Sequence, residues 1–425
     1  MKDIAEKSLF DIPGGWKTLL WILVILGIGM FIAGLMTGGE ESVVRTWQAF
    51  LINTVFWGGI AHAGVIFAVI WQITDAKWGR AFKRLAEACA GFLQISFLMF
   101  MVVFFGSHVL YEWTHTPFLH HGEAVKQGWL NLPFFISRNV FWLLLIYGIS
   151  YWFIKTSIKP DIALARRLIG SEWGGKFADW VLEDYGEHET EVIRLEKLSR
   201  KIAPVLALIY AIGGSFLAWD FVMTLDQTWF STLFGVFVMI GNMHAFLGLM
   251  LVVAVTVREK FGIEEYISIN RLHDLAKMTF AFSLLWTYMG YSQYIVIWYA
   301  DLPEETPYLI IRSMNAPWNT LFLVIILWVF VSVFIGLLPR TLCRIPNYIR
   351  LMGIWVMLGQ LLSVYIMVVP SLQHDGHYHI FMGLHELLIT LGFVGAFFLC
   401  YLAFLGKLPI LPISDKHLCR TWHGH

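Results

Sequence analysis

Cysteine is scarce in this sequence, and the few cysteines form no metal-binding motif. The 425 residues contain four of them, Cys89, Cys343, Cys400 and Cys419, with no CxxC and no CxxCH spacing. Iron–sulfur clusters and c-type haems are held by such cysteine groups, so the sequence predicts that this chain binds neither covalently. The same scatter argues against a structural disulfide.

Charge is scarce as well. Only 14% of the residues are charged, and the 30 basic and 30 acidic residues give a net charge of zero. With no basic arm either, nucleic acid is not a predicted partner. The chain is instead rich in hydrophobic residues, at 58%, and its mean hydropathy of +0.67 is too high for a soluble domain of this length. These values predict an integral membrane protein in a lipid bilayer.

Ten apolar runs predict an all-α fold of ten transmembrane helices. Each has about 20 residues, enough to cross about 30 Å of hydrocarbon. The first run follows a start of mixed charge without a small-residue cleavage site, which favours a retained span over a signal peptide. The predicted spans are 17–37, 47–73, 85–110, 133–155, 203–225, 229–256, 275–298, 318–338, 351–370 and 381–405.

The distribution of lysine and arginine predicts the orientation. Alternate connecting segments are basic, namely 77–84, 155–201, 258–271 and 340–350, whereas those between them contain only Arg45, Lys126 and Arg312. The positive-inside rule therefore places both termini in the cytoplasm. In the longest connection, 156–202, Pro160-Asp161 predicts a helix start and Gly170 its end, and a second helix is expected over Glu189 to Arg200. This mixed-charge segment is either a solvated face or a docking surface.

An internal repeat is a further hypothesis. Arg84-Leu85-Ala86-Glu87 and Arg271-Leu272-His273-Asp274 begin the third and seventh spans, and His62 and His244 lie near the middle of the spans before them. The pattern predicts two parallel four-helix bundles, 47–225 and 229–370, with 17–37 and 381–405 as flanking helices.

The span 275–298 carries unusually many polar residues. At 100° per residue its hydroxyl-bearing positions fall within about 120° of one another, with His273 on the same side. The stripe consists of Thr279, Ser283, Thr287, Tyr291 and Tyr294. Such hydroxyls either bond to their own helix and its neighbours or form part of a proton-conducting wire, and the sequence leaves both interpretations open.

The two mid-span histidines also allow several interpretations. His62 and His244 are satisfied packing residues, proton-relay or quinone-bonding groups, or the two axial ligands of one b-type haem. The outward segments add a fourth chemistry, because His374, His377 and His379 with Asp375 are residue types that bind metals, although their spacing matches no known closed site.

Ionisable residues gather near both ends of the spans. Glu87 with Gln94, and Asp274 with Lys277, are predicted at the cytoplasmic side, where Asp274 and Lys277 are close enough to pair. The groups predicted near the outer side are His108, Glu112, Arg138, Asp220, His385 and Glu386. Arg138 is expected to pair with a carboxylate such as Asp220 or Glu112. Groups at both ends with histidines between them are the pattern of two half-channels.

Two blocks of sequence resemble a known family. They are HDLAKMTFAFSLLWTYMGYSQYIVIWYADLPEET at 273–306 and LAWDFVMTLDQTWFSTLFGVFVMIGNMHAF at 217–246. Both are similar to the second large NrfD-type membrane subunit, the F subunit, of bacterial alternative complex III. The string SQYIVIWYADLPEET at 292–306 is the most specific part, and the ten-helix plan covers nearly the whole chain.

The resemblance implies a place in a quinol:cytochrome c or quinol:oxidase electron-transfer complex of the bacterial cytoplasmic membrane. Its iron–sulfur clusters and haem c would belong to partner subunits. Those partners would be a sister NrfD-like C subunit, an iron–sulfur and molybdopterin-type B subunit, cytochrome c subunits and small membrane subunits. The family implies either quinone binding or proton conduction for this kind of chain.

The hypothesis carried forward is proton movement through His62, Glu87, His244, Asp274 and Lys277. The stripe on 275–298 would connect these groups to Asp220 and to His385-Glu386. A quinone-facing cleft, in addition to the path or in place of it, is the second interpretation. A secondary transporter is a competing interpretation, since repeats and intramembrane polar residues fit one, but no pair of spans is broken by Gly or Pro at corresponding mid-span positions. A purely structural membrane anchor is the third.

Overall fold

A computed structural model describes residue 6 and the segments 10–36, 39–115, 128–373 and 379–415, and all of their regular elements are helical. Among these residues, nine helices are long and apolar enough to cross a membrane. This confirms a multi-pass, all-α membrane protein. The nine are α2 (Gly14–Met36), α3 (Glu40–Thr74), the compound crossing Arg80–Leu110, α8 (Leu132–Ile169), α10 (His188–Phe221), α11 (Phe234–Phe261), the compound crossing Trp318–Leu337, α16 (Pro346–Val368) and α17 (Leu384–Leu405).

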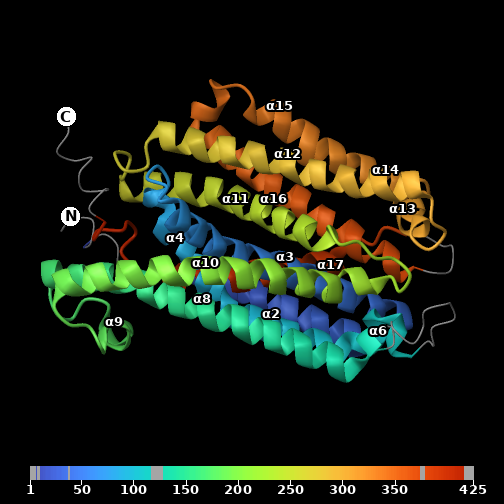
Figure 1. The fold of residues 1–425 in the computed structure, drawn as a ribbon, viewed down its shortest axis with the longest axis horizontal. Helices are drawn as coiled ribbons and strands as arrows, with labels where there is room; N and C mark the ends of the chain where they lie inside the picture. The colour runs from blue at the N-terminus through green and yellow to red at the C-terminus, as the bar shows by residue number, and fades with distance from the viewer. Residues whose placement is uncertain (1–5, 7–9, 37–38, 116–127, 374–378, 416–425) are drawn as a thin grey trace.

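The remaining predicted span, 275–298, lies within α12 (Ile269–Ala300), a helix of 32 residues. Its serines, threonines and tyrosines make it less apolar than the other nine. Ser268 caps its first turn by accepting from the backbone N–H of Arg271 at 3.4 Å. Asp301 ends it in the left-handed conformation, with φ of 47°. The helix lies beside α11 on one side of the molecule (Figure 1).

Two crossings are irregular. The first consists of α4 (Lys83–Glu87), α5 (Leu93–Val103) and α6 (Ser107–Leu110), joined by 3₁₀ turns. The second joins α14 (Trp318–Ile325) to α15 (Val333–Leu337) through a π-helical segment. In the predicted repeat these are the third and eighth spans, which do not correspond. The paired breaks of a transporter are therefore not seen in the helices that the structure describes.

Helix α3 lies at the centre of the molecule. It packs against α2, α5, α10, α11 and α17, while α11 packs against α12 and α16. Small residues let the backbones approach closely: a Cβ at Gly59 of α3 would overlap the Asn242 amide of α11, and one at Gly64 would lie 2.6 Å from the Cβ of Cys89. The contact between α3 and α11 joins the two predicted halves.

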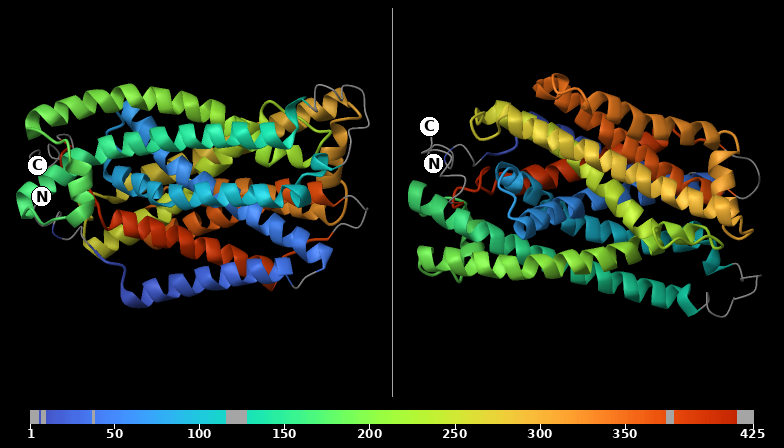
Figure 2. Two further views of the ribbon diagram at one scale, coloured as in Figure 1. Left: turned by 90° about the horizontal axis from the view of Figure 1, so that it is seen from below. Right: turned by 45° about the horizontal axis from the view of Figure 1, so that its top comes forward.

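Helices α2 and α17 lie side by side along one edge (Figure 2). They approach closely at Gly27 and Gly392, where a Cβ on either residue would collide with the backbone of the other helix. Arg45 and Thr46 of α3 bond Glu386 and His385 at the start of α17, so the pair is also fastened to the central helix. These contacts make the flanking helices part of the packed structure.

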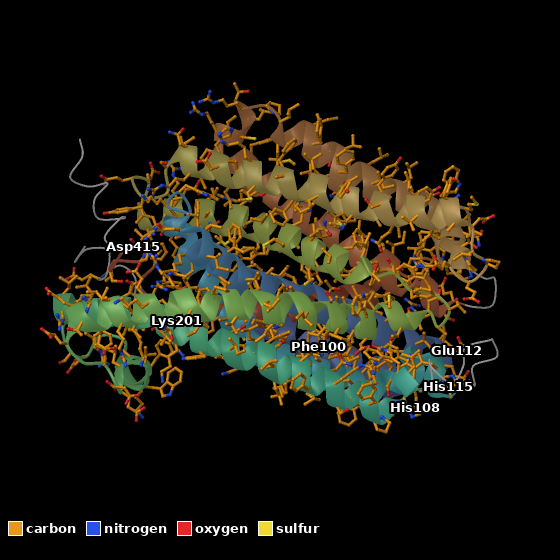
Figure 3. All side chains as sticks on the ribbon, viewed as in Figure 1. Phe100, His108, Glu112, His115, Lys201 and Asp415 are labelled. Atoms are coloured by element: carbon orange, nitrogen blue, oxygen red, sulfur yellow. The ribbon has the colours of Figure 1, made fainter. Side chains whose placement is uncertain are left out.

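The bundle has two ends, one with α9 (Gly175–Leu182) and the other with α13 (Thr306–Ser313) (Figure 1). Figure 3 shows Lys201 and Asp415 toward the first end and His108, Glu112 and His115 at the second.

The predicted layout of 156–202 is partly wrong. Pro160 does not start a helix, because α8 runs through it to Ile169, where Gly170 ends the helix as predicted. The expected helix over 189–200 exists but continues without a break into the next span as α10. A proline inside a helix costs about 3 kcal/mol. Here the next residue, Asp161, is anchored by Arg84 at 2.6 Å, which stabilises the continuous helix.

Candidate functional site

His62 lies inside the bundle, on α3, with 5% of its surface exposed. Its Nδ1 is 2.9 Å from the carbonyl oxygen of Gly58, and its ring edge meets Tyr147 at 4.6 Å between centroids. A carbonyl can only accept, so Nδ1 carries the proton and Nε2 is the basic atom. Nε2 is buried and has no hydrogen-bond partner among the described residues.

A cavity of about 50 Å³ borders His62 between α3, α10 and α11. Its lining is mostly apolar, with Tyr210 and Asn242 as the other polar residues beside the imidazole. About 10–15 Å³ of such space accommodates one water, so the cavity has room for a few. Gly59 leaves the space that the Asn242 side chain occupies.

His244 is completely buried on α11, and its Nδ1 lies 2.8 Å from Nε2 of Gln360 on α16. In the assigned amide orientation the Gln360 N–H donates, so Nδ1 accepts and the His244 proton sits on Nε2. That Nε2 is also buried without a partner in the described structure. The two histidines therefore hold opposite tautomers, with a basic Nε2 on His62 and a donating Nε2 on His244.

A second, smaller cavity lies between α11, α12 and α16. Its volume is about 10 Å³, and Asn242, Gln360 and Trp286 are among its lining residues. Because Asn242 lines both cavities, the two lie on either side of one side chain. We call His62, Asn242, Gln360 and His244 the polar seam. It crosses the contact between the predicted halves, and the roles of Asn242 and Gln360 were not predicted from the sequence.

The predicted stripe on α12 is not continuous. Thr279 and Ser283 are fully buried, but Tyr291 is 60% exposed on the outer side of the helix. Tyr294 is half-buried. The inward face passes instead through Trp286 and Gln293. Over a helix of this length an inward face repeating about every 3.5 residues diverges from a stripe spaced by four.

The hydroxyls of this stripe bond to their own helix. Thr279 donates to the Leu275 carbonyl at 3.0 Å, Ser283 to Phe280 at 2.8 Å, and Thr287 to Ser283 at 2.9 Å. Each donor is thereby used locally, which is the helix-bonding interpretation. Only the lone pairs of these hydroxyl oxygens remain, and they can accept a hydrogen bond from another donor.

Glu87 lies in a buried ionic network. It pairs with Arg84, accepts from the Ser157 hydroxyl at 2.6 Å and has no exposed surface, and Arg84 also binds Asp161. A cavity of about 190 Å³ lies against this network, with Lys83, Arg84 and Ser157 in its wall. Glu87 was predicted near the cytoplasmic side, but its partners were not predicted.

Asp274 and Lys277 form the predicted ion pair, at 2.7 Å, and both side chains are exposed. His273 precedes them and is half-buried. An exposed pair of this kind contributes about 0–1 kcal/mol. These residues lie at the surface of α12, whereas Glu87 is enclosed.

The outer arginine has the predicted partner. Arg138 donates from Nε and Nη2 to the two Asp220 oxygens at 2.6 and 2.7 Å, and Asn139 adds a third bond at 2.8 Å. Trp129 covers the guanidinium at 4.1 Å. Bidentate geometry of this sort satisfies both charges without water.

Among the described residues, His385 and Glu386 form hydrogen bonds with α3 and not with α12. Glu386 accepts from Arg45 at 2.8 Å and from the backbone N–H of Gly383, just before α17, at 2.9 Å. The Nε2 of His385 is 2.8 Å from the Thr46 hydroxyl. Their described bonds do not join the α12 stripe, so the predicted connection of that stripe to His385-Glu386 is not seen.

The metal hypothesis falls mainly outside the described residues, since His374, Asp375 and His377 are not among them. In the described segments no group of three His, Cys, Asp or Glu residues is placed to hold a metal ion. In comparisons with known proteins, no family model matches the chain and no curated protein matches it. The chain is thus a multi-pass helical membrane protein whose family is not identified by these comparisons.

Proposed function

We propose that this chain is a membrane subunit of a quinol:cytochrome c or quinol:oxidase electron-transfer complex, and that it contributes a proton-conducting path. The sequence blocks 217–246 and 273–306 support the first part through their resemblance to an NrfD-type subunit. The four cysteines of the chain form no cluster-binding or haem-binding motif, which supports redox centres held by partner subunits. The buried polar seam supports the second part.

The proposed architecture is two four-helix bundles with both termini in the cytoplasm. In its support, α3 and α11 occupy comparable central places, since α3 packs against α5 and α10 while α11 packs against α12 and α16. Lys201, in a basic connection, lies toward the same end as Asp415 in Figure 3. This orientation follows the positive-inside rule.

The observation that carries the proton path is the pair of buried imidazoles with unpartnered Nε2 atoms, one of which, His62, lines a cavity. A buried polar atom without a partner is costly, and small polar cavities usually satisfy it with water. Waters in the 50 Å³ cavity would bond Nε2 of His62 and meet Asn242. A path needs titratable groups and water, and the seam provides the groups and the room.

The size of the seam favours protons over a quinone at this place. Ligand pockets for small organic molecules and cofactors typically have about 300–1,000 Å³. The seam cavities have about 50 and 10 Å³, which is too little for a quinone headgroup or for a haem between the histidines. A quinone-facing cleft would then belong elsewhere, including surfaces shared with partners.

The test uses the assembled complex with His62→Gln or His244→Gln in this chain. We expect quinol oxidation to continue while the number of protons moved per electron falls by about half or more, because each variant removes a titratable ring from the path. The measurement is pH change per electron in vesicles. His115→Gln, at the outer end of the molecule (Figure 3), is the matched control. Unchanged coupling in both seam variants, with the complex intact, would refute the proton path.

A further inference from the structure

The outward side of α12 carries an unusual set of residues for a surface that faces hydrocarbon. The exposed positions repeat at alternating steps of three and four residues, which is the spacing of a helix–helix seam. They are Ala281, Leu284, Tyr288, Tyr291, Ile295 and Trp298, and we call them the α12 outer face. Tyr288 and Tyr291 are 62% and 60% exposed.

Tyr288 lies near the middle of the uncharged stretch of α12. Lys277 and Asp301 mark the two ends of the uncharged stretch of α12, and Tyr288 is 11 residues from one and 13 from the other. At 1.5 Å per residue these separations are about 16 and 20 Å, farther than a tyrosine side chain extends. Its hydroxyl cannot reach either polar interface.

Neither phenol has a hydrogen-bond partner in the part of the chain that the structure describes. Lipid chains supply no acceptor, and a hydroxyl held in hydrocarbon without one is strongly disfavoured. Serines and threonines avoid this cost by bonding to their own backbone, as Ser292 does to the Tyr288 carbonyl at 2.8 Å. The long tyrosine side chain cannot fold back in this way, so its acceptor must come from outside.

We propose that the α12 outer face is an interface for a transmembrane helix of another protein chain, one that presents hydrogen-bond acceptors such as carboxylate, amide or exposed carbonyl oxygens at mid-membrane depth. Ala281 lets that helix approach, while Tyr288 and Tyr291 donate to it. The inference depends on the membrane crossing of the chain and not on the proton path, so each can fail without the other.

A second copy of this chain fits less well. In a symmetric parallel pair the same residues meet at the same depth, so that each phenol faces its own counterpart. One phenol can then donate to the other, but the second hydroxyl hydrogen remains without an acceptor. A different helix with acceptors satisfies both donors.

The first test places a photo-crosslinking amino acid at position 288 or 291 of the full chain in its native membranes. We expect one discrete adduct with a different protein, and its crosslinked peptide should lie in a transmembrane helix that carries an acceptor residue. Position Leu208 on α10, also 62% exposed, is the control and should give lipid adducts. An adduct with a second copy of this chain, or lipid adducts alone at 288 and 291, would overturn the proposal.

The second test removes only the hydroxyls. Tyr288→Phe with Tyr291→Phe should lower the amount of this partner that copurifies in detergent by about three- to tenfold, because intramembrane hydrogen bonds are of that strength. Tyr299→Phe is the matched control, since Tyr299 is 86% exposed and lies near the end of α12, where headgroups and water supply acceptors. Equal copurification in the double variant and the control would also overturn the proposal.

Discussion

Gly59 shows how one missing side chain makes room for the polar seam. A Cβ there would overlap the Asn242 amide, which borders both cavities. The absence of a side chain on α3 therefore allows a polar residue of α11 to lie between His62 and Gln360. Small residues at helix contacts usually serve close packing, and here the close approach also holds an amide in place.

Replacing Gly59 tests this directly. We expect Gly59→Ala to displace Asn242, to lower the free energy of unfolding by about 1–3 kcal/mol through overpacking, and to reduce proton transfer in the assembled complex. Gly148→Ala in α8 is the matched control, because its added Cβ meets nothing within 4 Å. The control should be neutral or stabilising by up to about 1 kcal/mol. Denaturant titration and vesicle pH measurements report the two effects, and equal behaviour of both variants would contradict the expectation.

The sequence predicts individual residues well where chemistry restricts the choice of partner. Arg138 needed a carboxylate, and Asp220 supplies it. Gln360 was missed because it is 116 residues from His244 and a glutamine in an apolar span does not by itself indicate its partner. Partners of neutral polar groups depend on helix packing, which local patterns do not determine.

At the level of elements, the two predicted halves secure their third and fourth crossings in different ways. In the first, Arg138 near the start of α8 binds Asp220 near the end of α10. In the second, Arg312 of α13 precedes α14 and binds the end of α16, donating to the carbonyls of Ile366 and Met367, both at 3.0 Å. A carboxylate accepts in one half and a helix C-terminus in the other.

Arg312 is therefore expected to stabilise the outer end of α16. It is 4% exposed and also donates to the Ser371 hydroxyl at 2.6 Å and the Tyr308 carbonyl at 2.9 Å. Burial lowers the pKa of its guanidinium, which nevertheless stays protonated. Its side chain donates to several acceptors at once, which requires the planar guanidinium with its diverging N–H groups, here called the fork.

Arg312→Lys should lower the free energy of unfolding by about 2–3 kcal/mol, because an ammonium cannot reproduce the fork and the bonds to a charged donor are worth about 1.5–3 kcal/mol each. Unfolding in mixed detergent measures the loss. Arg340→Lys, at a less enclosed position between α15 and α16, should change stability by less than about 0.5 kcal/mol. A loss no larger than that of the control would show that the fork is not required.

The helices themselves illustrate what periodicity can predict. Length and hydropathy correctly indicate the long apolar spans, since about 20 apolar residues have few alternatives to crossing a bilayer. They fail at Pro160, where a buried ion pair holds α8 together across a residue that normally ends helices. They do not predict that Tyr291 is exposed, because which side of α12 faces inward depends on its neighbours.

At the scale of the whole molecule, Lys201 and Asp415 lie toward one end of the bundle and His108, Glu112 and His115 lie at the other (Figure 3). Together with the basic connections this predicts a cytoplasmic location for the residues near Gly186 and an outer location for those near Glu304.

Cysteine labelling in sealed cells can test this topology. Gly186→Cys should react only after the membrane is permeabilised, and Glu304→Cys should react with a membrane-impermeant maleimide in intact cells. The two exposed positions serve as controls for each other. Labelling of Gly186→Cys in intact cells would reverse the orientation.

The opposite tautomers of His62 and His244 have a consequence for the direction of transport. A backbone carbonyl cannot deliver a proton, so His62 cannot receive one at Nδ1 and release another at Nε2. In the proposed path it would gain and lose a proton at the same atom, Nε2. Net movement through His62 would require the water beside Nε2 to connect first with one side of the membrane and then with the other. The direction of proton movement would therefore depend on when the surrounding helices shift, because the imidazole itself favours neither direction.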